Sequence, residues 1–297
     1  SPTGVFKKHT DVMDVWFDSG SSHTGVIKAR GGVLPVDLYL EGSDQYRGWF
    51  NSSLIVSTAV YGHAPYKAVL SHGFVLDGKG EKMSKSLGNV VDPNKVIAQS
   101  GADILRLWTA SIDYQSDVRI SDDLLKQVTE NYRKIRNTFR FMLANLKDFD
   151  STKLLAFRDL PAPDAYVLYR VLEVAKTATE AYRNYDYKTV VSSVSSLLTN
   201  ELSSYYLDYT KDILYCDAKT SKSRLAVQTV LYHSVDVLTR LMAPILVHTM
   251  EEVWDHFKGS TESVHLQDFK LPEFKLDEPA IWDELFAVRS EVFKALE

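Results

Sequence analysis

The second half of the chain carries a regular pattern of apolar positions. Seven apolar residues recur at alternating spacings of three and four, namely Leu125, Val128, Tyr132, Ile135, Phe139, Met142 and Leu146. This spacing places them on one face of a helix, and Ser121, which two acidic residues follow, is a suitable N-cap. Further amphipathic stretches occur at 164–184, 187–210, 221–257 and 279–296. The pattern predicts an all-α helix bundle over residues 121–297, within which 121–160 would form a connecting helix and a linker.

Interruptions divide this helical half. Pro244 has no N–H donor and its ring clashes with the preceding turn, so we expect it to kink or split the stretch 221–257. The segment 148–163 contains two prolines and is predicted to be a connection. Residues 258–279 are predicted to be loop-rich, with one short strand at 264–266.

The first 120 residues follow a different pattern, in which short β-like runs alternate with turns. Runs at 36–40, 68–70 and 73–76 have the composition of strands, and apolar positions between 46 and 61 have helical spacing. Strand, helix and strand in this order predict a βαβ unit with a parallel sheet, where sites gather at the carboxyl ends of strands. Two such pieces are too few for a complete nucleotide-binding fold. The predicted fold class is therefore α/β followed by all-α: a partial Rossmann-like sheet over 1–120, then a helix bundle.

Composition narrows the class of protein. Hydrophobic residues make up 45% of the 297 residues and charged residues 25%, which is typical of a globular protein and excludes disorder. The single cysteine, Cys216, excludes an internal disulfide and a multi-cysteine zinc site; we expect it to be a small buried residue. No apolar run has the length of a membrane span. A cytoplasmic protein without a membrane partner is the expected class.

The net charge of −5 argues mildly against a nucleic-acid partner, but the charge is uneven along the chain. Between residues 122 and 147, six basic side chains face three acidic ones. Arg133, Arg136 and Arg140 fall on neighbouring turns of the predicted helix and could follow a phosphate backbone of tRNA. They could equally form a solvated helix face, or pair with acids of the first half.

The sharpest chemical signal is the pentapeptide Lys-Met-Ser-Lys-Ser at 82–86, which follows a glycine-containing turn. Lys82 and Lys85 are three positions apart and could close over a polyphosphate, where they would neutralise charge that develops during phosphoryl or nucleotidyl transfer. A solvated basic turn is the simpler alternative for two such lysines. The complete pentapeptide, however, is identical to the signature loop of class I aminoacyl-tRNA synthetases.

A second motif follows the first predicted strand. The sequence Glu-Gly-Ser-Asp-Gln-Tyr-Arg-Gly-Trp-Phe at 41–50 leads into the predicted helix, and its carboxylates and amide could bind an ammonium group and ribose hydroxyls. A capping turn beside a buried tryptophan would explain it equally well. Together with residues 15–23 it resembles the isoleucyl-tRNA synthetases, of bacterial type, within class I. Residues 240–254 resemble the helical domain of the same family, so the resemblance covers essentially the whole chain.

The resemblance implies roles for individual positions. The aromatic walls of the isoleucine pocket would be Trp16 and Trp49. The adenylate would be held by four residues of the second motif, namely Glu41, Gly42, Asp44 and Gln45. Residues near the adenosine would be His72, Gly73 and Phe74, although His72 could also be a purely structural histidine. Lys82 and Lys85 would stabilise the pyrophosphate leaving group, and Lys85 would contact ATP.

The resemblance also implies an activity and reveals departures from the family. ATP, with Mg²⁺, would activate L-isoleucine, and the product would be transferred to tRNA(Ile). The family's His-x-Gly-His sequence, its editing domain and its cysteine-rich zinc module are absent from these residues. We therefore expect an internal segment: the C-terminal half of a catalytic domain (1–120) and an anticodon-binding domain (121–297), without full activity alone and without a metal site. A non-catalytic tRNA-binding module and a different nucleotidyltransferase are the alternatives.

Overall fold

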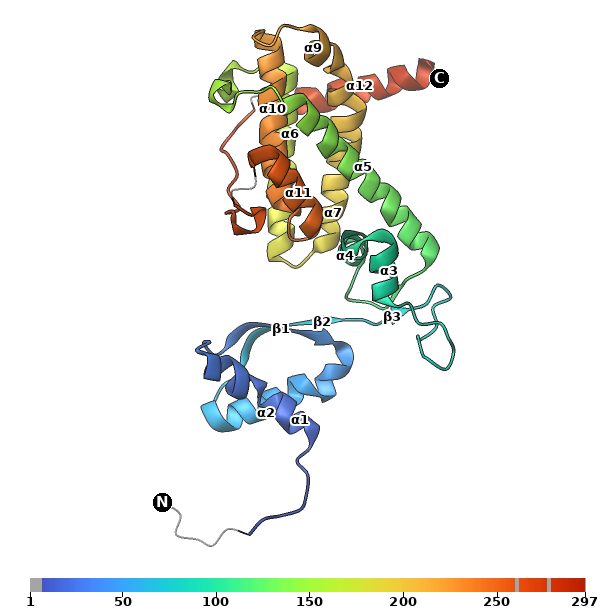
Figure 1. The fold of residues 1–297 in the computed structure, drawn as a ribbon, viewed down its shortest axis with the longest axis vertical. Coiled ribbons are helices and arrows are strands. Elements are labelled where there is room, and N and C mark those ends of the chain that lie inside the picture. Colours follow the sequence, from blue (N-terminus) through green and yellow to red (C-terminus); the bar gives the residue numbers. More distant parts are fainter. Residues whose placement is uncertain (1–6, 260–261, 277–278, 297) are drawn as a thin grey trace. The chain divides into compact units, whose positions relative to one another are not determined.

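A computed structural model describes residues 7–259, 262–276 and 279–296 (Figure 1). The chain divides into two compact units: residues 1–88 with 113–119, and residues 89–112 with 120–297. This division differs from the single boundary at residue 120 that the sequence predicts, because the segment 89–112 packs with the helical unit.

The first unit is built around one βαβ element, as the sequence predicts. Strands β1 (Val36–Gly42) and β2 (Tyr66–His72) are parallel, and helix α2 (Trp49–Tyr61) connects them. The register places Glu41 opposite Ser71 and Gly42 opposite His72, so both strands end at the same edge. A 3₁₀ turn at Ser43–Arg47 leads from β1 into α2.

Smaller elements complete this unit. Helix α1 (Val15–Gly20) packs on α2 and is followed by a π-helical turn (His23–Ile27) and a 3₁₀ turn (Lys28–Arg30). Strand β3 (Val75–Leu76) pairs in parallel with β4 (Val118–Arg119), which confirms a strand in the predicted run at 73–76 but shortens it to two residues.

The second unit is helical (Figure 1). Its helices are α3 (Pro93–Ser100), α4 (Ala102–Ser111), α5 (Asp122–Leu146), α6 (Ala162–Arg183), α7 (Tyr187–Ser196), α8 (Leu207–Tyr209), α9 (Lys211–Cys216), α10 (Lys222–Met242), α11 (Val247–Lys258) and α12 (Ala280–Leu296). The segment Leu197–Tyr206 continues α7 as π-helix, and 3₁₀ turns occur at Ser151–Lys153, Phe157–Asp159 and Val264–Leu266.

Most sequence expectations for this unit are confirmed. Ser121 caps α5, since its Oγ accepts the backbone N–H of Leu124 at 3.3 Å. Pro244 lies in the break between α10 and α11 and thus splits the predicted stretch 221–257. The strand expected at 264–266 is wrong: a 3₁₀ turn forms there, because the side chain of Ser263 accepts the N–H of His265 and caps the turn. Cys216 is exposed at the end of α9 and not buried as expected.

Helix α4 explains why the segment 89–112 belongs to the helical unit. Its buried face, which includes Ile104 and Leu107, packs against α5 and α7. Arg106 donates to the carbonyl oxygens of Pro244 (2.7 Å) and Ile245 (2.9 Å) at the end of α10. Helix α4 is therefore fixed to the break between α10 and α11 by both apolar packing and hydrogen bonds.

The largest buried cluster lies among the long helices. Helices α6 and α10 pack along each other, and α5 and α7 cover them; fully buried members include Leu168, Leu172, Leu197 and Leu231. In the described residues, no helix is both long enough and apolar enough to cross a membrane.

Candidate functional site

Four predicted site residues meet where β1 and β2 end. A Cβ built on Gly42 would lie 2.8 Å from Asp44 Oδ1, 3.6 Å from His72 Cε1 and 3.9 Å from Phe74 Cε1. Gly42 is buried, whereas Asp44 and Phe74 are exposed. A side chain at position 42 would fill the space between these groups, so glycine keeps the strand ends open. We call Gly42, Asp44, His72 and Phe74 the strand-end cluster.

The imidazole of His72 has a defined orientation. Its Nδ1 lies 2.8 Å from the carbonyl oxygen of Gly73. A carbonyl oxygen can only accept, so Nδ1 carries the proton and Nε2 of the neutral ring is left as an acceptor. The backbone of the next residues is held as well, since Gly73 N donates to Tyr114 O (2.9 Å) and Phe74 N donates to Asp117 Oδ1 (2.7 Å).

Asp117 is a residue that sequence reasoning missed. Its contact with Phe74 joins positions 43 residues apart, and no local pattern indicates such a pair. A Cβ on Gly73 would lie 2.3 Å from the carbonyl oxygen of Ser116, so this backbone approach requires glycine. The loop 113–117 therefore fixes residues 72–74 at the strand ends.

Of the two predicted pocket tryptophans, Trp16 approaches Gly48 in space, and Trp49 is the next residue in the chain. A Cβ built on Gly48 would meet Cη2 of Trp16 at 2.8 Å and Oε1 of Gln45 at 2.7 Å. Gln45 Oε1 also accepts the backbone N–H of Trp49 at 3.0 Å, and Gln45 Nε2 donates to Asp44 Oδ2 at 3.3 Å. The aromatic residues are thus connected to the strand-end cluster through Gln45.

The two tryptophans differ in their surroundings. The Trp49 ring stacks on Tyr39 with 4.0 Å between centroids, and its Nε1 donates to Ser19 O at 3.0 Å. Trp49 therefore contributes to the packing of α2 on α1 and β1. Trp16 is 42% exposed and has room to contact a ligand.

The signature loop is an ordered turn on which both lysines are exposed. Asp77 Oδ1 accepts the N–H groups of Lys79 (2.9 Å) and Glu81 (2.8 Å), and this closes the turn 77–81 that leads into the signature loop. Gly80 adopts φ +85°, and a Cβ there would lie 3.0 Å from Arg119 Nε. Sequence reasoning missed Arg119, which adds a third cation near the loop.

The structure does not join all the predicted residues. In the part of the chain that it describes, no hydrogen bond or ion pair links Lys85 to the strand-end cluster. Glu41 is exposed at the end of β1. Over the same described residues, no group of three or more His, Cys, Asp and Glu side chains is arranged to hold a metal ion.

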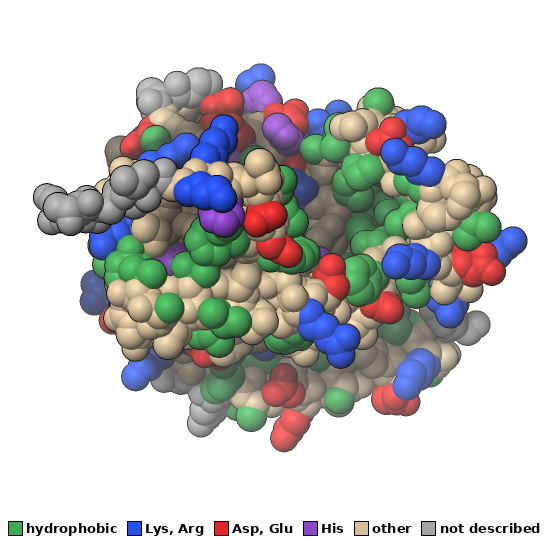
Figure 2. Space-filling model, turned by 90° about the horizontal axis from the view of Figure 1, so that it is seen from below, with side chains coloured by type: hydrophobic (Ala, Val, Ile, Leu, Met, Phe, Trp, Pro, Cys, Tyr) green, Lys and Arg blue, Asp and Glu red, His purple; other side chains and the backbone are tan. Residues whose placement is uncertain are grey.

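The first unit leaves apolar side chains at its surface. Hydrophobic side chains lie among charged ones on the face shown in Figure 2, and the exposed apolar residues of β1 and α2 include Leu40, Ile55 and Val60. The described sheet pairs only β1 with β2. It is therefore a part of a Rossmann-like sheet and not a complete one.

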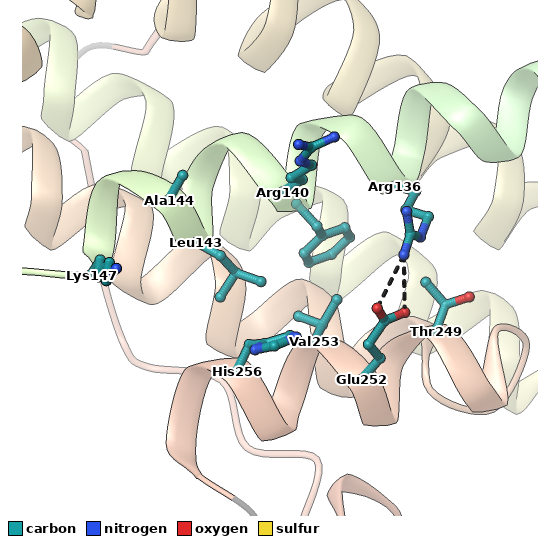
Figure 3. Close-up of a pocket in the computed structure, with 10 residues that line it drawn as sticks. Arg136, Arg140, Leu143, Ala144, Lys147, Thr249, Glu252, Val253 and His256 are labelled. Carbon is teal, nitrogen blue, oxygen red and sulfur yellow. Dashed lines mark hydrogen bonds and ion pairs between the residues drawn. The ribbon is translucent and has the colours of Figure 1, made fainter.

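The predicted basic residues of α5 have partners within the helical unit. Arg133 pairs with Glu130 on the same helix at 2.6 Å. Arg136 Nη2 lies 3.0 and 3.3 Å from the two carboxylate oxygens of Glu252 on α11. Arg140 is exposed beside a groove between α5 and α11 (Figure 3). Arg133 and Arg136 thus each have an acidic partner within the helical unit.

Two known families match the chain. The family described as tRNA synthetases class I (I, L, M and V) matches residues 1–121. The family described as the anticodon-binding domain of tRNA ligase matches residues 164–297.

Curated relatives and solved structures agree with these matches. The chain is 57% identical over its full length to the isoleucine–tRNA ligase of Geobacillus kaustophilus and 55% identical to that of Bacillus cytotoxicus, and it spans 33% of each. The fold is similar to that of a LeuRS–tRNA–LeuAMS complex of Agrobacterium radiobacter K84 (TM-score 0.71, 18% identity), over 96% of this chain and 40% of that one. It is also similar to methionyl-tRNA synthetase of Mycobacterium tuberculosis with methionyl-adenylate (TM-score 0.62, 18% identity), over 74% and 44%. With both halves matched and relatives aligned over its full length, this chain belongs to the isoleucine–tRNA ligase family of class I tRNA synthetases.

Proposed function

We propose that this chain supplies part of the aminoacyl-adenylate site and the tRNA-binding helices of an isoleucine–tRNA ligase. A carboxylate oxygen of L-isoleucine attacks the α-phosphorus of MgATP, the bond to the bridging oxygen breaks, and pyrophosphate leaves. A ribose hydroxyl at the end of tRNA(Ile) then attacks the carbonyl carbon and loses its proton, and AMP leaves. The observation that carries the proposal is the convergence of the strand-end cluster at the carboxyl ends of parallel strands.

The amino acid is proposed to bind at the aromatic side of this cluster. Trp16 and Trp49 would enclose the apolar side chain, and burying it would contribute about 1.5–3 kcal/mol. Asp44, with Glu41 next to it at the end of β1, would bind the ammonium group. Gln45 supports this arrangement, since it contacts Asp44, the backbone of Trp49 and the space beside Trp16.

The nucleotide is proposed to bind at the other side. The open backbone at Gly42 leaves room for the ribose or the adenine, and the ring of Phe74 offers an apolar surface. His72 Nε2 would accept a hydrogen bond from the adenosine, since Nδ1 already donates to Gly73. Gly73 is required by the approach of the loop 113–117 and positions its neighbours.

Lys82 and Lys85 are proposed to stabilise the leaving pyrophosphate. Both lysines are exposed, and the turn 77–81 that Asp77 closes leads into their loop, so the loop presents two cations on long side chains. Charge on the pyrophosphate grows as the α-phosphorus bond breaks, and a cation placed there stabilises the transition state more than bound ATP. Mg²⁺ would arrive with ATP as part of the substrate.

The helical unit is proposed to bind tRNA(Ile), with Arg133, Arg136 and Arg140 facing its backbone. The family match at 164–297 and the basic stripe on α5 support this. A non-catalytic tRNA-binding module is the alternative for the 297 residues alone, because the sheets in the described part have only two strands each, β1 with β2 and β3 with β4.

Isoleucine-dependent exchange of pyrophosphate into ATP tests the proposal. A longer polypeptide that contains this sequence should catalyse exchange with isoleucine and not with leucine or methionine. The 297 residues alone should bind tRNA without exchange, because positioning worth about 7–11 kcal/mol depends on a complete site. Exchange by the longer polypeptide with another amino acid only would contradict the proposed substrate.

A further inference from the structure

A groove with cationic side chains along its α5 side runs between α5 and α11 (Figure 3). Its volume is about 590 Å³. Arg136, Arg140 and Lys147 lie along α5 at spacings of four and seven, so they project from one face of the helix. They line the groove together with His256 of α11. Cationic side chains from α5 thus border one continuous cavity.

The floor of the groove is apolar and fixed. Phe139 is fully buried and Val253 is 5% exposed, and both belong to the main core of the helical unit. Thr249 at one end is held from two sides: its Oγ1 lies 2.9 Å from Tyr132 Oη, and it donates to Asp103 Oδ2 at 2.6 Å. The floor of the groove is therefore formed without a ligand.

One acidic side chain interrupts this cationic lining. Glu252 of α11 reaches Arg136 across the groove, and a single guanidinium nitrogen faces both carboxylate oxygens at 3.0 and 3.3 Å. The pair is half-exposed, at 46% for Arg136 and 52% for Glu252. In Figure 3, Arg136 points toward Glu252, whereas the guanidinium of Arg140 stays beside α5.

We propose that this groove binds a phosphate of the tRNA backbone and that Glu252 holds the place of that phosphate beside Arg136 in the free protein. The inference rests on the proposed function, since it takes tRNA as the partner. A carboxylate and a phosphate offer a guanidinium the same acceptor geometry, so one can replace the other at Arg136. The apolar floor suits the sugar next to the phosphate.

The exchange of Glu252 for a phosphate would give selectivity. A small anion that contacts only Arg136 must displace the Glu252 carboxylate, so its net free energy of binding is small. An RNA strand that meets Arg136, Arg140 and Lys147 together gains two further contacts and displaces Glu252. Glu252 thus disfavours the binding of small anions and of RNA that contacts Arg136 alone. It also lowers the affinity for the correct partner.

The test measures binding of a labelled tRNA(Ile) transcript to the 297-residue chain over a salt series. Glu252→Gln should tighten binding about two- to five-fold at low salt, because an exposed ion pair of this kind no longer has to be broken. Arg140→Gln and Lys147→Gln should each weaken binding and lower the slope of log K against log salt by about one.

Glu180→Gln is the matched control. It makes the same change in net charge and releases Arg183 from an exposed pair of 3.3 Å elsewhere in the helical unit. It should leave tRNA affinity within the error of the wild type. Circular dichroism melts of all four variants show that the fold is kept.

Three results would overturn the inference. One is equal tightening by Glu252→Gln and Glu180→Gln, since only total charge would then matter. Another is equal response of poly-glutamate and tRNA to these variants, which would indicate an acidic-peptide site. The third is no tRNA binding by the wild-type chain at low salt. The third result would also contradict the tRNA-binding part of the proposed function, whereas the first two would leave that part standing, and isoleucine-dependent exchange is measured separately.

Discussion

Asp103 joins two helices of the second unit that are distant in sequence. Its carboxylate, which is 6% exposed on α4, accepts three hydrogen bonds from the start of α11: His248 N (3.3 Å), Thr249 N (2.8 Å) and Thr249 Oγ1 (2.6 Å). The carboxylate therefore caps α11 from another element. Replacement of Asp103 by Ala removes these acceptors and leaves the amide and hydroxyl groups buried.

The magnitude follows from the contacts. Loss of a helix cap costs about 0.5–2 kcal/mol, and a buried donor left unpaired adds about 1–3 kcal/mol. Tyr132 Oη lies 2.9 Å from Thr249 Oγ1 and keeps one partner for that hydroxyl, so the second cost falls at its low end. Asp103→Ala should therefore lower the free energy of unfolding of the helical unit by about 2–3 kcal/mol. For a unit of this size the melting temperature should fall by about 4–12 °C.

Asp186 provides a matched control. It caps α7 through the same two groups of a threonine, Thr189 N (3.1 Å) and Thr189 Oγ1, but it is exposed. Water can replace its hydrogen bonds, so Asp186→Ala should cost only about 1 kcal/mol. Urea titration and thermal melts by far-UV circular dichroism measure both variants. If Asp103→Ala were no more destabilising than Asp186→Ala, burial would not add to the cost and the reasoning would be refuted.

Three further predictions concern the site and its support. In a longer ligase that contains this sequence, Lys85→Ala should slow adenylate formation about 10²–10³-fold with isoleucine affinity kept, whereas exposed Lys79→Ala should have little effect; equal rates for the two would remove the role of Lys85. Trp49→Ala should raise the isoleucine KM and also lower the melting temperature, because Trp49 stacks on Tyr39, whereas Trp16→Ala should raise the KM alone; a stability loss without a KM change would make Trp49 purely structural. Burial lowers the pKa of His233, so the unfolded chain takes up a proton at a higher pH than the folded one, and stability should fall as pH drops below about 6.5; urea titrations of wild type and His233→Phe should show a weaker pH dependence in the variant.

Periodic patterns in the sequence predict most of the helical unit. The apolar stripe from Leu125 to Leu146 and the cap at Ser121 locate α5 correctly, because one face of this helix must be buried whatever it packs against. Pro244 predicts the break before α11, since its effect on a helix is local. The parallel pair β1 and β2 follows from the βαβ order in the same way.

Features that depend on distant contacts are missing from the sequence prediction. The segment 89–112 joins the helical unit because Asp103 and Arg106 contact residues near Pro244 more than 130 positions later. Val264 looks like part of a strand, but it has no strand partner among the described residues and packs into the helical core. Cys216 is exposed at the end of the short helix α9, which its residue type does not indicate.

The candidate site shows the same division. The motifs at 41–50 and 82–86 indicate Asp44, Gln45 and Lys85 as candidate site residues, because each motif consists of consecutive residues and can be read from the sequence. Residues of other elements contact the candidate site or the basic stripe, namely Asp117, Arg119 and Glu252. These contacts can be seen only in the folded structure. Sequence reasoning thus gives the candidate site residues of each motif but not the residues of other elements that contact them.

Gly42 offers the most direct test of the claim that adenylate forms at the strand ends. A methyl group there would lie 2.8 Å from Asp44 Oδ1 and would fill the strand-end cluster, whereas one at Gly25 would meet nothing within 4 Å. Isoleucine-dependent pyrophosphate exchange should be measured for Gly42→Ala and Gly25→Ala in a longer ligase that contains this sequence. The account predicts a loss of about 100-fold or more for Gly42→Ala, with its melting temperature kept, and normal exchange for Gly25→Ala. Normal exchange by a folded Gly42→Ala enzyme would contradict it.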